Sequence, residues 1–486
     1  MSIAQDMPND NDTNAGGQMR AVLERQKQAH IREGAPSAEL RIDRINRAIG
    51  LIVDYQNEIC DALSKDFGHR STDQSIMSDV VGCLSGLKEA KKSLRKWMRP
   101  ENRSTMFPLN LAGGKSRVEY QPLGTVGLIT PWNFPMAMTF SPLAGIFAAG
   151  NRVMMKPSEY TPRASELMAT MFSKAYDENE VAVFTGGPEV GQAFSTLPFD
   201  HIIFIGATAV GKHIMRAAAE NLVPVTLELG GKSPTIIGKS SPMQMSTDRI
   251  MNGKMLNAGQ ICLAPDYVFV PKGNEDAFVA SAQRSVATMY PSLKDNPDYT
   301  SVINQRHYDR LQGYIADARS KGARVVEINP ANEDFTQQQA HKIPPTLLLD
   351  VSEDMKIAQE EIFGPLLMVK TYAGIDEVID YVNTHPRPLA LYYFGEDQAE
   401  KQRVLARTTS GGVAVNDVMM HVAQEDLPFG GVGASGMGSY HGYDGFKNFS
   451  HAKAVFEQGR RFDLGRFMRP PFTPRLRKIL SSQVKR

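Results

Sequence analysis

Apolar and polar positions follow a regular order from about residue 124 onward, where short apolar runs alternate with segments of helical spacing. Short apolar runs bounded by Gly, Pro or polar residues predict buried strands, and the segments between them predict helices. Repeated strand–helix–strand units of this length predict an α/β fold with a parallel, doubly wound sheet, which binds ligands at the carboxyl ends of its strands. The predicted strands are GTVGLIT (124–130), NRVMMK (151–156), VAVF (181–184), DHIIFIG (200–206) and PVTLEL (224–229), with helices over 141–150, 161–176 and 208–220.

A second alternating block follows and predicts a second α/β domain that begins near Glu228. No internal repeat or low-complexity linker separates the two blocks, so we expect closely packed domains with a site in the cleft between them. Residues 1–20 are polar and rich in Gly, Asn and Asp, which predicts disorder. The strands predicted in the second block are DYVFV (266–270), ARVVEI (323–328), TLLLD (346–350), PLLMV (365–369) and LALYYF (389–394).

The overall charge excludes some functions. The chain has 486 residues and a formal net charge of +1, which gives no electrostatic case for nucleic acid or an acidic membrane. A basic segment with scattered aromatic residues follows residue 459 and suits either anionic lipid or a trailing arm; Pro470 and Pro471 favour the arm because they break a long amphipathic helix.

Cysteine usage favours a reducing compartment, so we expect a cytoplasmic protein. Cys60, Cys83 and Cys262 form no CxxC pair, and no secretory signal opens the chain. No apolar run approaches the roughly 18 residues that a membrane span needs, so no integral membrane anchor is expected. The ten histidines show no H-E-x-x-H spacing, so no metal site is expected.

Two glycine-containing segments resemble cofactor loops. GVGASG (431–436) matches G-x-G-x-x-G but lacks the preceding strand and following helix, so it is better interpreted as a tightly turning loop. FIGATAVGK (204–212) runs a strand through Gly206 into a helix whose first amides suit a phosphate or nicotinamide. Alone this second signal is weak, because many strand–helix turns carry glycine.

Five ordered motifs are more specific than either loop. Together they resemble the NAD(P)-dependent aldehyde dehydrogenase superfamily, over nearly the whole chain from about Ala21. The segment from Leu427 to His451 and the CLAPDY run after the cysteine resemble the class 3 branch, which includes bacterial coniferyl aldehyde dehydrogenases. The motifs are PWNFP (131–135), KPSE (156–159), LELGGKSP (227–234), GQICLAPDY (259–267) and EEIFGP (360–365).

The resemblance implies a Rossmann-type cofactor domain, a second α/β catalytic domain and a small β oligomerisation arm. It implies that Cys262 is the nucleophile, that Asn133 joins the Cys262 backbone N–H in an oxyanion hole, and that Glu228 activates the water that hydrolyses a thioester. The structural alternatives are an inert buried thiol, a turn-forming asparagine and an ion-paired glutamate at a strand end. The implied ranges are 21–103 and 122–227 for the cofactor domain, 228–417 for the catalytic domain, and 104–121 and 418–486 for the arm and tail.

The cofactor residues also follow from the resemblance. Lys156 and Glu159 would bind the adenosine ribose, where a carboxylate favours the free hydroxyls of NAD; NADP is the alternative. Glu361 and Phe363 would hold the nicotinamide ribose and ring. The other implied contacts are Thr130, Pro131, Trp132, Gly206 and Leu229.

The branch implies an aldehyde substrate, either aromatic such as coniferyl aldehyde or medium- to long-chain aliphatic, and a homodimer. Phe134 is either a lining of the substrate tunnel or a core residue. The alternatives are a coenzyme-A-acylating dehydrogenase, which generally lacks the glutamate that Glu228 supplies, a cysteine hydrolase, and a non-catalytic structural or binding protein. A cysteine hydrolase would need a partner histidine, and no histidine lies near Cys262 in the sequence. A non-catalytic role would tolerate loss of Cys262 or Glu228, but both residues are present.

Overall fold

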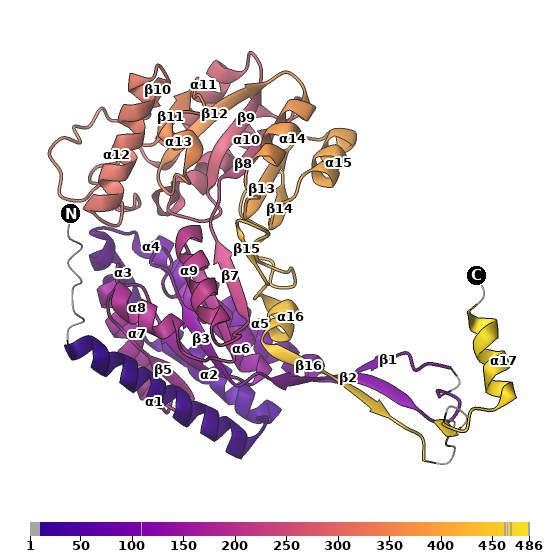
Figure 1. Ribbon diagram of the computed structural model, residues 1–486. Coiled ribbons are helices and arrows are strands. Elements are labelled where there is room, and N and C mark those ends of the chain that lie inside the picture. The colour runs from indigo at the N-terminus through magenta and orange to yellow at the C-terminus, as the bar shows by residue number, and fades with distance from the viewer. Residues whose placement is uncertain (1–9, 108, 461–462, 464, 467–468, 485–486) are drawn as a thin grey trace, which may run out of the picture.

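The computed structural model describes residues 10–107, 109–460, 463, 465–466 and 469–484. Figure 1 shows two α/β domains, one above the other, and an arm of three strands that projects from the lower one. The lower, first domain holds a six-stranded sheet and the upper, second domain a seven-stranded sheet. The predicted α/β fold is confirmed.

The first sheet has the strand order β15-β7-β6-β3-β4-β5. All neighbours are parallel except β15, which runs antiparallel to β7. The chain order reverses between β3 and β6, and such a switch point is where open α/β sheets bind ligands. The strands are β3 (Thr125–Ile129), β4 (Arg152–Lys156), β5 (Val181–Val183), β6 (His201–Gly206), β7 (Val225–Leu229) and β15 (Gly436–Met437).

Helices cover both faces of this sheet because its strands are apolar on both sides. Val153 and Met155 of β4 pack with α2, α5, α6 and α7, whereas Met154 packs on the opposite face with α1, α8 and α9. The helices of this domain are α1 (Asp10–Glu33), α2 (Ala38–Asp54), α3 (Gln56–Phe67), α4 (Thr72–Ser75), the π-helix η1 (Ile76–Val81), α5 (Gly82–Trp97), α6 (Ala137–Ala149), α7 (Pro162–Ala175), α8 (Pro188–Ser195), α9 (Thr208–Ala219) and α16 (Gly442–Asn448).

The second sheet has the order β10-β11-β12-β9-β8-β13-β14, with only β10 antiparallel to its neighbour. All five strands predicted in this block are present. Its strands are β8 (Ser233–Ile237), β9 (Pro265–Pro271), β10 (Arg324–Glu327), β11 (Thr346–Leu349), β12 (Leu366–Tyr372), β13 (Ala390–Phe394) and β14 (Gly412–Val415). Its helices are α10 (Met243–Met255), the 3-10 helix η2 (Leu256–Gly259), α11 (Glu275–Met289), α12 (Gln305–Ser320), α13 (Lys356–Gln359), α14 (Ile375–Thr384) and α15 (Gln398–Arg407).

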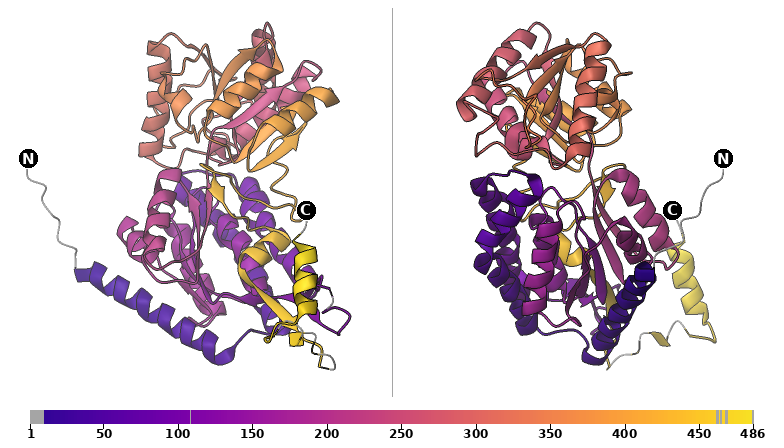
Figure 2. Two further views of the ribbon diagram at one scale, coloured as in Figure 1. Left: turned by 45° about the vertical axis from the view of Figure 1, so that its right-hand side comes forward. Right: turned by 90° about the vertical axis from the view of Figure 1, so that its left-hand side faces the viewer.

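The arm is an antiparallel sheet of β1 (Glu101–Arg103), β2 (Lys115–Pro122) and β16 (Ser450–Glu457) in the order β1-β2-β16. The last helix, α17 (Pro474–Gln483), follows the arm and has no buried residue. Figure 1 shows α17 well away from the first domain, beyond the end of the arm, and Figure 2 shows the arm and α17 from two further directions.

The predicted disorder of residues 1–20 is wrong for residues 10–20, which form the start of α1. The cause is tertiary packing: Met19, Val22 and Leu23 are buried against β4, α8 and α9, which compensates for the polar composition. Residues 1–9 lie outside the described residues.

Two predicted boundaries also differ from the structure. Glu228 belongs to β7, so the first sheet continues to Leu229 and the second domain begins after it. Residues 418–449 lie outside the arm, because β15 completes the first sheet and α16 packs on α5 and α6. The chain therefore returns to the first domain before it enters the arm.

Among the described residues, every helix is too short or too polar to cross a lipid bilayer.

Replacement of Leu23 by Ala tests the packing of α1. Leu23 is 2% exposed, so Leu23→Ala should lower the free energy of unfolding by about 2–5 kcal/mol. Ile31→Ala is the matched control, because Ile31 lies on the same helix and is 73% exposed; its effect should stay within about 0.5 kcal/mol. Urea denaturation followed by fluorescence gives both values, and equal midpoints would contradict the docking of α1.

Candidate active site

Four residues predicted to contact a cofactor lie where parallel strands of the first sheet end. Thr130 follows β3, Lys156 ends β4, Gly206 ends β6 and Leu229 ends β7. The register brings these ends to one edge, because Ile129 of β3 pairs with Lys156 and Gly206 pairs with Leu229. This edge adjoins the switch point between β3 and β6, as the sequence predicts.

Cys262 approaches the same region from the second domain, just before β9 begins. Three consecutive residues before it have left-handed backbone, with φ of 50° at Asn257, 49° at Ala258 and 70° at Gly259. A Cβ on Gly259 would lie 2.3 Å from the carbonyl oxygen of Gly364, so only glycine fits there. A non-glycine residue in this region costs free energy, and such strain is typical of functional sites.

Glu228 is buried beside Cys262 near the end of β7, with 1% of its surface exposed. The Tyr440 hydroxyl donates a hydrogen bond to Glu228 Oε2 at 3.1 Å, and the Cys262 thiol lies close enough to the same carboxylate to lower its pKa. Burial raises the pKa of Glu228 to about 7, against these two groups, which lower it. Oε1 has no hydrogen-bond partner among the described residues, which leaves it free to accept a proton.

The environment of Cys262 is unfavourable for a free thiolate. Burial raises the pKa of the Cys262 thiol well above its usual value, and the charges of Glu228 and Glu361 raise it further. A thiol is a nucleophile only after it loses its proton. Glu228 is in contact with the thiol and can accept that proton, so the pair has the composition of a nucleophile with its base.

Asn133 is buried and reaches the same loop. Its side-chain nitrogen donates a hydrogen bond to the carbonyl oxygen of Gln260 at 3.1 Å, two residues before Cys262. An amide nitrogen carries two N–H groups, so this contact leaves a second donor. Phe134 is a core residue, 7% exposed and packed in the main hydrophobic cluster.

The Glu361 carboxylate lies against the turn that follows Glu228. The Gly231 N–H lies close enough to the carboxylate to lower its pKa, and a Cβ on Gly230 would lie 2.2 Å from Glu361 Oε2. Burial raises the pKa of Glu361 to about 8. Phe363 has left-handed backbone and packs edge-on against Trp132, with ring centroids 5.3 Å apart, which joins the two domains.

Two cations fix the segment that carries Glu361 and Phe363. Arg310 donates to the carbonyl oxygens of Glu361 at 3.2 Å, Ile362 at 2.8 Å and Phe363 at 3.4 Å. Lys232 donates to the carbonyl oxygens of Ile357 and Glu360, both at 2.8 Å. The backbone is thereby held in place while the Glu361 side chain remains directed at the site.

The donor set of the strand ends fits a dinucleotide. Lys156 Nζ lies 2.9 Å from a carboxylate oxygen of Glu159, and the pair offers both a donor and an acceptor to a ribose. A side chain at position 230 would collide with the Glu361 carboxylate, so a glycine there lets the backbone lie close to Glu361. Glu361 Oε1 is buried without a partner among the described residues and is available to a second ribose. Pro131 continues the turn between Thr130 and Trp132 and is half-buried.

Comparison with known proteins identifies the family. A model described as the aldehyde dehydrogenase family matches residues 14–455. The chain belongs to the aldehyde dehydrogenase family. It is 60% identical over 471 residues to a probable coniferyl aldehyde dehydrogenase of Caulobacter vibrioides, covering 96% of this chain and 97% of that one. It is 54% identical to the coniferyl aldehyde dehydrogenase of Pseudomonas sp. strain HR199, covering 96% of each chain.

Solved structures agree with this assignment. The substrate-bound state of Staphylococcus aureus AldH is similar with a TM-score of 0.89 and 36% identity, covering 96% of this chain and 99% of that one. The NAD+ complex of a Bacillus cereus aldehyde dehydrogenase has a TM-score of 0.81 and 26% identity, covering 91% of this chain and 89% of that one. The family resemblance carried by the five motifs is thus confirmed, and the chain is an aldehyde dehydrogenase enzyme.

Several contacts in the aldehyde dehydrogenase site could not be predicted from the sequence. Tyr440 lies 212 positions from Glu228, and Arg310 lies 51 positions from Glu361, so neither contact shows in a local pattern. Lys232 is part of LELGGKSP, but the motif alone does not reveal that its ammonium group holds the distant segment 357–360.

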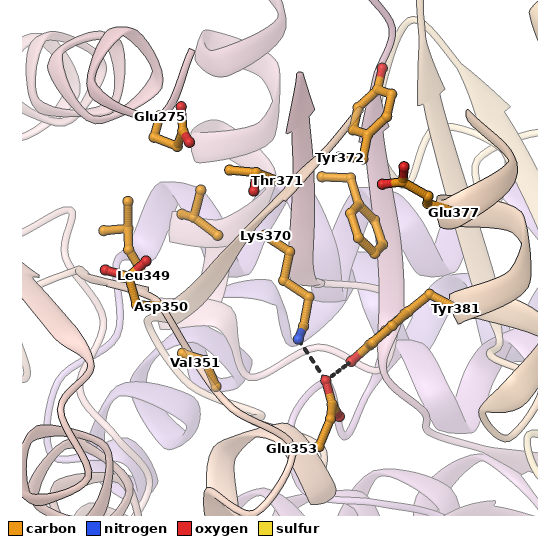
Figure 3. A pocket seen from close by; sticks show the side chains of 12 residues that line it. Glu275, Leu349, Asp350, Val351, Glu353, Lys370, Thr371, Tyr372, Glu377 and Tyr381 are labelled. Atoms are coloured by element: carbon orange, nitrogen blue, oxygen red, sulfur yellow. Dashed lines mark hydrogen bonds and ion pairs between the residues drawn. The ribbon is translucent and has the colours of Figure 1, made fainter. Parts of the chain in front are cut away.

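A cavity lies on the second domain (Figure 3). It lies at the carboxyl ends of β9, β11 and β12, where Glu353 accepts hydrogen bonds from Lys370 at 2.7 Å and Tyr381 at 3.0 Å. Cys262 precedes the amino end of β9. The cavity is therefore at the opposite end of the sheet from the candidate site.

The thiol environment predicts how alkylation depends on pH. Iodoacetamide should label Cys262 rather than the buried Cys60 and Cys83, at a rate that rises with pH as the thiolate forms. Glu228→Gln removes a negative charge that raises the pKa of Cys262, so this pKa should fall and labelling at neutral pH should become faster. Peptide mass spectrometry locates the label; slower labelling in Glu228→Gln would contradict this electrostatic account.

Proposed function

We propose that this enzyme oxidises an aromatic aldehyde of the coniferyl type to its carboxylic acid with NAD. The observation that carries the proposal is the contact between the Cys262 thiol and the buried Glu228 carboxylate, with Asn133 bonded to the same loop. The substrate rests on the two relatives named as coniferyl and probable coniferyl aldehyde dehydrogenases. Medium- and long-chain aliphatic aldehydes are the alternative.

In the first step of this proposal, Glu228 accepts the thiol proton and Cys262 Sγ attacks the aldehyde carbon. The C=O bond becomes a C–O⁻ single bond in a thiohemiacetal. The Asn133 side-chain N–H and the Cys262 backbone N–H donate to this oxygen. Removal of one such donor typically costs on the order of 10² to 10³ in rate.

The oxidation step needs a hydride acceptor, which NAD supplies when bound. Lys156 and Glu159 bind the adenosine ribose and Glu361 the nicotinamide ribose, while Phe363, Trp132, Thr130, Pro131, Gly206 and Leu229 shape the groove. The carboxylate of Glu159 favours unphosphorylated ribose, hence NAD over NADP. The Bacillus cereus relative was solved as an NAD+ complex, which supports this choice.

In the last step Glu228 returns its first proton to solvent and then accepts one from water. The resulting hydroxide attacks the thioester carbon, the C–S bond breaks, and the acid leaves with Cys262 restored. A pKa near 7 suits both proton transfers at neutral pH.

The arm and the cysteines support two further proposals. A homodimer is supported by the projecting sheet of β1, β2 and β16, which leaves strand edges available for pairing.

A cytoplasmic location is supported by the three free cysteines.

The direct test is an activity panel of cinnamyl-type and aliphatic aldehydes with NAD or NADP, with and without coenzyme A. We expect acid without coenzyme A, a preference for NAD, and the highest kcat/KM for cinnamyl-type aldehydes. Cys262→Ala should be inactive. Glu228→Gln should turn over at least about 10²-fold more slowly, because it lacks the carboxylate that accepts a proton first from the thiol and then from water. A requirement for coenzyme A would overturn the hydrolytic proposal, and a preference for aliphatic aldehydes would overturn the substrate.

Tyr440→Phe tests the base through its pKa. The Tyr440 hydroxyl stabilises the charged form of Glu228, so its removal should raise the pKa of Glu228 above about 7 and shift the acid limb of kcat to higher pH. Activity at pH 6 should therefore fall more than activity at pH 9. Tyr443→Phe is the matched control, because the Tyr443 hydroxyl bonds to Glu101 instead, and its pH profile should match the wild type. An unshifted profile in Tyr440→Phe would argue against Glu228 as the titrating base.

A further inference from the structure

A buried ion pair in the first domain lies directly behind the turn that carries Asn133. Arg70 and Asp79 are joined by an Nη2–Oδ2 contact of 2.7 Å, and both side chains are 0% exposed. Neither residue belongs to a motif of the family resemblance or to the groups that react in the proposed mechanism. A buried ion pair is weak evidence for stability, because desolvation offsets the attraction. Its directional contacts therefore need another explanation.

Those contacts converge on the backbone around Asn133. Arg70 Nη1 donates to the Asn133 carbonyl oxygen at 3.0 Å. Asp79 Oδ1 accepts the N–H groups of Met136 and Ala137, both at 3.1 Å, at the start of α6. The guanidinium lies 4.9 Å from the ring centroid of Phe134, next to Asn133. One ion pair thus holds both sides of the turn.

The second domain holds the same turn from the other side. The Asn257 side chain donates to the Asn133 carbonyl oxygen at 3.1 Å and to the Gln260 carbonyl oxygen at 3.2 Å. Gln74 in turn accepts the Asn257 backbone N–H at 3.0 Å. The carbonyl of Asn133 therefore accepts one hydrogen bond from each domain, while its side chain bonds to the loop that ends in Cys262.

The segment that carries Arg70 is itself fixed to the second domain. The Ser301 N–H donates to the His69 carbonyl oxygen at 3.0 Å, and the Ser71 hydroxyl donates to Asp298 at 3.4 Å. Asp79 lies in the π-helix η1, a rare conformation that is frequent at functional sites. The second domain thus holds the loop between α3 and α4, on which Arg70 lies, at the residues on either side of Arg70.

We infer that Arg70 and Asp79 are positioning residues, which set the distance between the Asn133 amide and the Cys262 thiol and so align the oxyanion donor. The inference rests on the oxyanion role proposed for Asn133. A displacement of about 1 Å in such a group can cost on the order of 10²-fold in rate. The cofactor is proposed to bind at the strand ends and not at the Arg70–Asp79 pair, so the KM for NAD should not change when the pair is replaced.

The test separates position from stability by removing both charges together. Arg70→Met/Asp79→Asn leaves no unpaired charge, and the amide oxygen introduced at position 79 can still accept the two backbone N–H groups. We expect kcat to fall about 10-fold or more, the KM for NAD to stay within 2-fold, and the isotope effect with deuterium on the aldehyde carbon to rise. Arg44→Met/Glu180→Gln is the matched control, because this pair of the same domain, 2.9 Å apart, has no contact with Asn133. It should leave kcat unchanged.

A double-mutant cycle with Asn133→Ala tests whether the Arg70–Asp79 pair acts on kcat through Asn133. In the Asn133→Ala background, replacement of the pair should lower kcat by less than 2-fold further, because its effect passes through Asn133. If Asn133→Ala alone keeps the wild-type kcat, the oxyanion role is wrong and the inference fails with it. The positioning role is wrong, and the oxyanion role stands, if Asn133→Ala lowers kcat but the paired replacement lowers it further by its full factor. The same conclusion holds if Asn133→Ala lowers kcat but the paired replacement alone leaves kcat unchanged.

Arg70→Lys is the second variant, for the case in which the paired replacement does not fold. It keeps the charge but loses the fork that reaches Asp79 and the Asn133 carbonyl together. We expect the same selective loss of kcat, about several-fold, and the same absence of a further effect in Asn133→Ala. A wild-type kcat in a folded Arg70→Lys protein would overturn the inference.

Discussion

The burial of one carboxyl group organises the candidate site. Glu228 would be an ordinary acid with a pKa near 4.5 if it were exposed, and burial raises that pKa to about 7. Such burial costs free energy, so the surrounding protein must offset it. Tyr440 does so with a hydrogen bond from the returning C-terminal segment, and the Cys262 thiol approaches the carboxylate from the second domain. The two domains and the return of the chain are thus all needed to place this group.

Most of the fold was predictable because strand and helix signals are local. The doubly wound order from β3 to β7 follows from apolar runs such as those of β4 and β6, and the five predicted strands of the second domain are present. The start of α1 was not predictable, because its polar residues form a helix only through three apolar positions that pack on a distant sheet. The strands of the arm are polar and half-exposed, so they carry no apolar run to indicate them.

The residues of the candidate site also divide into those that short sequence motifs indicate and those that only tertiary contacts reveal. Cys262, Glu228, Asn133, Lys156, Glu159 and Glu361 were identified from short motifs, and the structure brings Cys262, Glu228, Asn133 and Glu361 to one region. Tyr440, Arg310 and the pair Arg70–Asp79 were not identified, because each acts on backbone or side chains that are far away in sequence. Motifs therefore indicate the groups proposed to react, whereas the groups that hold them emerge only from tertiary contacts.

The placement of β15 has a consequence for the order in which the protein is made. Residues 436–437 pair with β7, yet they are synthesised after every strand of the second domain. The ribosome therefore releases the whole second domain before the first sheet receives its last strand and Glu228 its tyrosine. Domains generally fold as units, N-terminal first, as the chain emerges. In this chain Cys262 is made before the Glu228 carboxyl group is enclosed, so an unfinished polypeptide carries the proposed nucleophile while its proposed base still lacks the contact with Tyr440.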